Sequence, residues 1–168
     1  MSERAKRGIV MGFAGLLAHC GFAGEGLLEA RFSLINAASR IMGSLEQNKK
    51  NAIAFYETMF NKAEPMEAVR LYVGKDYIQH NPGVEDGKDG FIRYFTKMAK
   101  EHPGKSVQIR RAIAEGNFVV LHCLQKWPGG KDYATIDIFR FDDDGKIAEH
   151  WDVIQQIPKK SQNENTMF

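Results

Sequence analysis

Residues 133–156, YATIDIFRFDDDGKIAEHWDVIQQ, decide the fold of this chain. The stretch begins with β-branched and aromatic side chains, which favour a strand. Three aspartates and Gly145 then form a turn signal, and the apolar pattern resumes at Ile147. The stretch therefore predicts two long antiparallel strands joined by a tight turn.

Two aspartates stand inside these predicted strands. Asp137 lies between Ile136 and Ile138, and Asp152 follows Trp151 in the return strand. Carboxylates are uncommon in strands and costly to bury without partners. The pair is therefore the first place to look for function.

The rest of the chain changes from a helical period to a strand period. Apolar residues first recur at helical spacing and later alternate with polar ones. Helix signals include the capping box Ser44–Gln47, Pro65 in a first turn and Gly74 as a stop. Helices followed by an antiparallel meander predict an α+β fold, with helices covering one face of a curved, mainly antiparallel sheet. The expected helices span residues 44–61, 64–74 and 87–100, a brief extended piece covers 76–81, and the expected strands span 107–114, 118–127, 133–141 and 147–156.

Composition and charge exclude several classes of protein. Lys and Arg total 23 against 21 Asp and Glu, and no basic cluster is dense enough to follow phosphates, so we expect no nucleic-acid partner. The only cysteines, Cys20 and Cys123, form neither a disulfide framework nor a Cys-x-x-Cys motif. No His-x-His or His-Glu-x-x-His spacing occurs, so we expect no metal.

Residues 1–43 differ in character from the remainder and are expected to form an N-terminal extension. Basic side chains precede an apolar run over residues 9–18, which resembles a secretory signal but is too short for a membrane span. The alternatives are a poorly ordered leader, a translation start placed too far upstream, and an extra helix over residues 27–41. The domain is expected over residues 44–157, followed by a polar tail over residues 158–168. We expect a cytoplasmic protein, or an exported one if the signal functions.

Several segments, taken in order, resemble the SnoaL-like polyketide cyclases, a branch of the nuclear-transport-factor-2-like (NTF2-like) superfamily. They are an opening amphipathic helix, DYIQHNP at residues 76–82, a helix begun by glycine, and a closing strand reading DGKIAEHWDVIQ at residues 144–155. The resemblance covers residues 44–157. It implies a cone-shaped α+β barrel with three N-terminal helices, an apolar cavity, no cofactor and a homodimer formed through the sheet.

The resemblance also implies site residues. Cyclases of this family close rings by intramolecular aldol condensation, with an aspartate as acid/base that lies three residues after the glutamate of the GKIxE stretch. That aspartate matches Asp152. The family's assisting histidine precedes an arginine by three residues; Arg140 marks that position here, and Asp137 occupies it. Two carboxyl groups in an apolar cavity titrate apart, which supplies a base and an acid at neutral pH.

Strand alternation bears on whether the two aspartates share a face. If residues 143–145 form a three-residue loop, Asp137 lies opposite Trp151, and Asp152 points to the other face with His150. A bulge in the last strand would return Asp152 to the face of Asp137, and bulges occur beside active sites. Both registers stay open at this point.

Two histidines and four aromatic residues complete the candidate site. His122 is expected to face a carboxylate, and His80 to cap the cavity mouth as a second acid/base, whereas His150 is expected to be structural. The alternatives for His122 and His80 are a satisfied core histidine and a turn hydrogen bond. The expected substrate-binding residues are a hydrogen-bond donor, Tyr77, and an apolar wall, with core packing as its alternative, formed by Tyr133, Phe139 and Trp151.

The sequence thus predicts a cofactor-independent acid/base enzyme for a small apolar carbonyl compound, with aldol condensation or a related proton transfer led by Asp137 and Asp152. Alternatives are a non-catalytic ligand-binding or dimerisation module of the same fold, and an epoxide hydrolase or isomerase of the superfamily. The carboxylates discriminate between these functions. Ion pairs from both aspartates to arginines outside the cavity would favour the binding module. The structural alternative for Asp137 is a carboxylate bonded to Arg140, Thr135 or backbone. The structural alternative for Asp152 is an interface ion pair with Arg110 or Arg111.

Overall fold

The computed structural model describes residues 21–168, and the chain divides into two compact units, residues 1–40 and 41–168. Helix α1 (Gly21–Tyr56) contributes to both units. The signal-like run at residues 9–18 lies outside the described residues. No helix within residues 21–168 combines the length and apolarity that crossing a membrane requires.

The predicted helix start at Ser44 is wrong, because α1 is already helical before that residue. Ser44 Oγ donates to the carbonyl oxygen of Ile41 at 2.8 Å, one turn back in the same helix, and so does not cap an N-terminus. The extra helix considered for residues 27–41 is part of α1.

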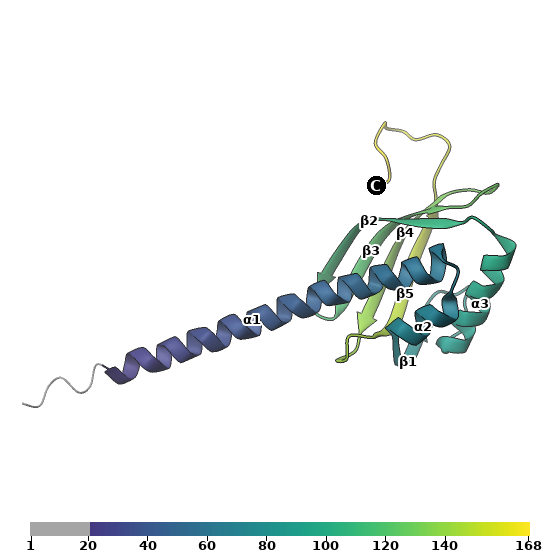
Figure 1. The fold of residues 1–168 in the computed structure, drawn as a ribbon. Helices are drawn as coiled ribbons and strands as arrows, with labels where there is room; N and C mark the ends of the chain where they lie inside the picture. Colours follow the sequence, from purple (N-terminus) through teal and green to yellow (C-terminus); the bar gives the residue numbers. More distant parts are fainter. Residues whose placement is uncertain (1–20) are drawn as a thin grey trace, which may run out of the picture. The chain divides into compact units, whose positions relative to one another are not determined.

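The second unit contains the remaining elements in an α+β order (Figure 1). Their spans agree closely with the periodicity of the sequence. They are a π-helical turn η1 (Glu57–Asn61), α2 (Pro65–Tyr72), β1 (Val73–Gln79), α3 (Gly87–Glu101), β2 (Ser106–Glu115), β3 (Phe118–Lys126), β4 (Tyr133–Phe141) and β5 (Ile147–Gln156).

The strands form one sheet in the order β1-β5-β4-β3-β2. Only the β1–β5 pair is parallel; the other neighbours are antiparallel. Because β1 and β2 are edge strands that do not pair with each other, the sheet is open and the predicted barrel is not closed. The helices of this unit cover one face of the sheet, here called the inner face (Figure 1).

Aromatic side chains join the helices to the inner face. The ring of Phe139 on β4 contacts Phe55 and Tyr56 of α1 edge-on, at centroid distances of 5.9 and 5.5 Å. Phe91 of α3 packs on Phe55 at 5.4 Å. These rings are almost fully buried, and such pairs contribute about 0.5–1.5 kcal/mol each beyond their area burial.

A bulge in β5 sets the register of the hairpin. Phe141 pairs with Ile147, but Arg140 pairs with Glu149, so Ala148 is the extra residue. The strict register is therefore wrong and the bulged one is correct. Because one inserted residue moves every later side chain to the opposite face, Asp152 lies directly opposite Asp137.

Candidate functional site

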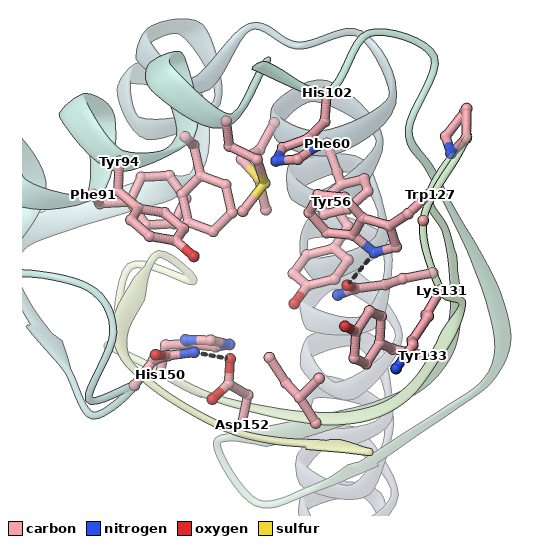
Figure 2. Close-up of a pocket in the computed structure, with 18 of the residues that line it drawn as sticks. Tyr56, Phe60, Phe91, Tyr94, His102, Trp127, Lys131, Tyr133, His150 and Asp152 are labelled. Atoms are coloured by element: carbon pink, nitrogen blue, oxygen red, sulfur yellow. Dashed lines mark hydrogen bonds between the residues drawn. The ribbon is translucent and has the colours of Figure 1, made fainter. Parts of the chain in front are cut away.

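A cavity of about 430 Å³ lies between the helices and the inner face of the sheet (Figure 2). Most of its wall is apolar. The π-helical turn η1 contributes two of the wall residues, and such turns are frequent at functional sites. The principal apolar wall residues are Phe55, Met59, Phe60, Phe91, Phe95 and Met98.

Asp152 is the carboxylate that lines this cavity. Burial raises the pKa of Asp152, and the negative charge of Asp137 adds to the effect. A hydrogen bond from Asn81 and the charge of His150 act in the opposite direction but do not cancel it. The Asn81 amide donates from Nδ2 to Asp152 Oδ2 at 2.7 Å. Asp152 therefore has a higher proton affinity than an ordinary aspartate.

His150 lies beside Asp152 in the cavity wall and is only 5 % exposed. Its Nδ1 lies 3.0 Å from Gln79 Oε1, an oxygen that also accepts from the backbone N–H of Asn81 at 2.9 Å. Because that oxygen is an acceptor, Nδ1 of His150 must carry a proton. The other nitrogen, Nε2, faces Asp137 Oδ1 at 3.4 Å.

Asp137 lies behind His150 and is 1 % exposed. One oxygen accepts from the hydroxyl of Tyr56, and the other accepts from Thr135 Oγ1 at 2.6 Å. Burial and the charge of Asp137 raise the pKa of Tyr56 well above its usual value, so this phenol stays protonated and donates. Asp137 does not line the cavity. Its Oδ1 faces His150 Nε2, so Asp137 is placed to orient the His150 ring.

The segment from Gln79 to Asn81 makes hydrogen bonds to both His150 and Asp152. Gln79 fixes His150, and Asn81 reaches Asp152. The backbone N–H of Gly83 donates to Asn81 Oδ1 at 2.7 Å, which leaves the amide nitrogen directed at the carboxylate. This short segment is a positioning element.

Two tyrosine hydroxyls also border the cavity, from Tyr94 on α3 and Tyr133 on β4 (Figure 2). Neither makes a hydrogen bond to another residue of the described chain. Burial, with the charge of Asp152, raises the pKa of Tyr94, so its hydroxyl remains a donor at neutral pH.

The site also has the donor set of a cation site. Asp137, His150 and Asp152 each offer one ligand atom, and these atoms lie within 4.8 Å of one another. One nitrogen and two carboxylate oxygens suit a divalent metal. The oxygens of Asp137, however, already accept from Tyr56 and Thr135. The absence of a metal from this site stays a prediction.

The sequence of this unit matches a known family. The model of the SnoaL-like domain matches residues 52–150, which is more than half of the chain. The chain belongs to the SnoaL-like domain family. A search of curated proteins found no match.

Solved structures with the same fold include SnoaL-like and related proteins. A candidate polyketide cyclase from Bacillus cereus is 22 % identical, with a TM-score of 0.57 over 64 % of this chain and 74 % of that one. TsrD from Streptomyces laurentii is 22 % identical, with a TM-score of 0.54 over 67 % and 88 %. A candidate ketosteroid isomerase from Kribbella flavida is 16 % identical, with a TM-score of 0.56 over 74 % and 89 %. At these identities the likeness shows the fold alone.

Three of the predicted site residues lie on the outer face of the sheet, away from the cavity. His122 Nδ1 accepts from Arg111 Nη1 at 2.7 Å, and its ring stacks on Phe168. His80 stacks on Trp151 with ring centroids 4.7 Å apart. The predictions that His122 faces a carboxylate, that His80 caps the mouth and that Trp151 forms the apolar wall are therefore wrong. Strand alternation places His122 on the outer face, and the bulge in β5 turns Trp151 to the same face.

The remaining predicted residues lie at different depths. Tyr133 lines the cavity. Phe139 is fully buried and packs on the aromatic core and against His150 at 4.8 Å. The Tyr77 hydroxyl accepts from Gln79 Nε2 at 2.9 Å and does not line the cavity.

His150 is the functional candidate that sequence reasoning missed. It precedes Asp152 by two residues, and residues two apart in a strand share a face. Once Asp152 was assigned to the cavity, the same alternation would have placed His150 beside it. Neither Asp137 nor Asp152 pairs with an arginine within residues 21–168. Asp137 does accept from Thr135, one of the partners named in its structural alternative.

Proposed function

We propose that this protein is a cofactor-independent acid/base enzyme acting on a small, largely apolar carbonyl compound. The reaction class is aldol condensation, ring closure or a related proton transfer. One observation supports this proposal most directly: a carboxyl group with a raised pKa, Asp152, borders a mainly apolar cavity and has no arginine or lysine partner within residues 21–168. Perturbed carboxyl groups in apolar clefts are typical of catalytic acids and bases.

In the proposed mechanism, Asp152 removes a proton from the carbon next to the substrate carbonyl. A partly desolvated carboxylate is a stronger base than one in water, which suits this step at neutral pH. Negative charge then develops on the carbonyl oxygen. The free hydroxyl of Tyr94 faces the cavity and donates a hydrogen bond to that oxygen.

His150 takes the assisting role that sequence reasoning gave to His122 or His80. Its ring is fixed by Gln79 at one nitrogen and by Asp137 at the other. The charge of His150 acts to lower the pKa of Asp152 and so limits how far burial raises it. Asp137 therefore acts through His150 as a positioning residue.

We also propose that the protein forms a homodimer through the outer face of the sheet. Apolar side chains are exposed there, including Val153 at 71 %, Phe118 at 40 % and Ile136 at 38 %. A second copy of the same face would cover them, as an isologous interface requires.

The second candidate function is a non-catalytic module that binds a small apolar ligand, which the aromatic cavity alone would permit. The arginine ion pairs that would favour it are not formed by Asp137 or Asp152 within the described chain. Hydrolysis of an epoxide would require a polar trio that holds a water molecule, and no arginine is among the described residues that line the cavity.

The test is deuterium exchange at carbon. Small cyclic diketones and aryl methyl ketones are incubated with protein in heavy water, and loss of the C–H signal next to the carbonyl is followed by NMR. We expect the wild type to accelerate exchange for at least one compound and Asp152→Asn to abolish it. The matched control is Asp143→Asn in the exposed turn. Binding of a ketone without exchange, or full exchange by Asp152→Asn, would support the binding module instead.

A further inference from the structure

The cavity has two polar ends of opposite character. Asp152 and His150 occupy one end. The other end is bordered by Lys131, His102 and Tyr133, which we call the donor rim (Figure 2). Every polar group of the donor rim is cationic or can donate a hydrogen bond, and none is a carboxylate. Apolar side chains separate the two ends.

The charge of Lys131 is not compensated within the described chain. Its Nζ donates to a neutral oxygen, Gln156 Oε1, at 3.0 Å. The neighbouring carboxylate of Asp132 is already engaged, because it accepts from Lys126 Nζ at 2.8 Å and from the backbone N–H of Trp127 at 3.2 Å. Lys131 is exposed, and it borders the cavity without an ion pair to the described residues.

The backbone places this lysine at the rim. The turn after β3 reverses at Gly129, whose φ is +76°, a conformation that favours glycine. The backbone N–H of Gly130 closes the turn by donating to the carbonyl oxygen of Trp127 at 2.9 Å. The same turn holds Trp127, which His102 contacts edge-on at 5.0 Å. Lysine and histidine thus reach the cavity from two different elements, the turn and the end of α3.

We propose that the donor rim is a subsite for a carboxylate, so that the substrate is an elongated keto acid with an apolar middle. This inference rests on the proposed function, since the carbonyl is the part that meets Asp152. The negative charge of Asp152 repels an anion and the positive charge of Lys131 attracts it, so the two ends together fix the direction of binding.

A pair of fluorescent probes tests the subsite without any catalysis. 1-Anilinonaphthalene-8-sulfonate carries an anionic group on an aromatic skeleton, and N-phenyl-1-naphthylamine has the same skeleton without the charge. Lys131→Gln is expected to weaken binding of the anionic probe about fivefold, which is the effect of losing a partly screened ion pair. Binding of the neutral probe should not change. Lys75→Gln, at an exposed lysine on β1, is the control and should change neither probe.

Asp152→Asn gives a response of opposite sign. Removing the negative charge of Asp152 is expected to strengthen binding of the anionic probe and to leave binding of the neutral probe unchanged. Opposite responses to Asp152→Asn and Lys131→Gln would show that the anionic probe binds in this cavity. Equal weakening of both probes by Lys131→Gln, or no weakening of either, would overturn the subsite. Failure of deuterium exchange with normal probe behaviour would instead count against catalysis, so the two proposals fail separately.

Discussion

Two carboxyl groups of β5, Asp152 and Glu149, lie on opposite faces of one strand and respond oppositely to their surroundings. Burial alone would raise the pKa of Glu149, but hydrogen bonds and charge from His80 and Arg140 outweigh it and hold that pKa below its usual range. Glu149 accepts from His80 at 2.8 Å and from Arg140 at 2.6 Å. Within the described part of the chain, the Asp152 side chain accepts only from the neutral amide of Asn81, and burial raises its pKa.

On this strand, burial raises the pKa of the carboxyl group that accepts from a neutral amide, but not that of the carboxyl group bonded to histidine and arginine. Outer-face carboxylates with cationic partners are stabilised in their ionised form and lose proton affinity. On the inner face the strong partners are amides, hydroxyls and one histidine. Chemistry is therefore expected on the inner face and ordinary surface stabilisation on the outer face.

The largest expected difference between the faces is catalytic. Asp152→Asn should lower the rate of proton exchange by about 10²–10⁴-fold, the usual contribution of a general base. Glu149→Gln, the matched change on the outer face, should keep the rate within about twofold, because it touches no cavity group. NMR exchange rates of both variants check this. Equal losses in the two variants would mean that the faces do not differ in function.

The next effect concerns the buried inner network. Tyr56→Phe removes the hydroxyl that donates to Asp137 and leaves that buried oxygen, Oδ1, with only the 3.4 Å contact to His150 Nε2. The free energy of unfolding should therefore fall by about 1–3 kcal/mol. Urea denaturation measures the loss. Tyr72→Phe is the control, because the Tyr72 hydroxyl makes no hydrogen bond to the described residues. A loss in the control as large as in Tyr56→Phe would count against the network.

A smaller effect is expected on stability as a function of pH. Because the folded-state pKa of Asp152 is raised, folding favours its protonated form. That contribution is fully present below the unfolded pKa of about 3.9 and is lost as pH rises through the folded pKa. The melting temperature of Asp152→Asn should therefore equal that of the wild type in acid. At neutral pH it should be a few degrees higher than that of the wild type. A variant less stable than the wild type at neutral pH would contradict the sign.

The smallest expected effect is that of a chelator. Asp137 is engaged by Tyr56 and Thr135, so we expect the site to work with its hydrogen bonds intact. Exchange rates measured before and after dialysis against a chelator should agree. A loss restored by adding a divalent cation would show instead that the Asp137–His150–Asp152 cluster holds a metal.

Much of the fold could be predicted from the sequence, because periodicity and turn residues are local signals. The strand over residues 133–141 has the predicted bounds, and α3 begins at the predicted residue, Gly87. Asp152 could be predicted as a cavity residue from the family resemblance. The start of α1 could not, because a capping box at Ser44 looks the same inside a longer helix.

The rest of the site depends on pairing between distant segments. The bulge at Ala148 arises from how β4 meets β5, and it exchanges His150 for Trp151 on the inner face. The roles of Gln79 and Asn81 come from the parallel β1–β5 contact, which no local pattern encodes. Of the two aspartates and two histidines predicted for the site, only Asp152 lines the cavity, and the histidine beside it is His150.

An NMR titration of the side-chain carboxyl carbons measures both pKa values, with Asp152→Asn and Glu149→Gln used to assign the two signals. We expect Asp152 to titrate above the value of about 3.9 for a free aspartate, and Glu149 to titrate below the value of about 4.3 for a free glutamate. An Asp152 midpoint at or below the free value would contradict the claim that this carboxyl group is poised as a base.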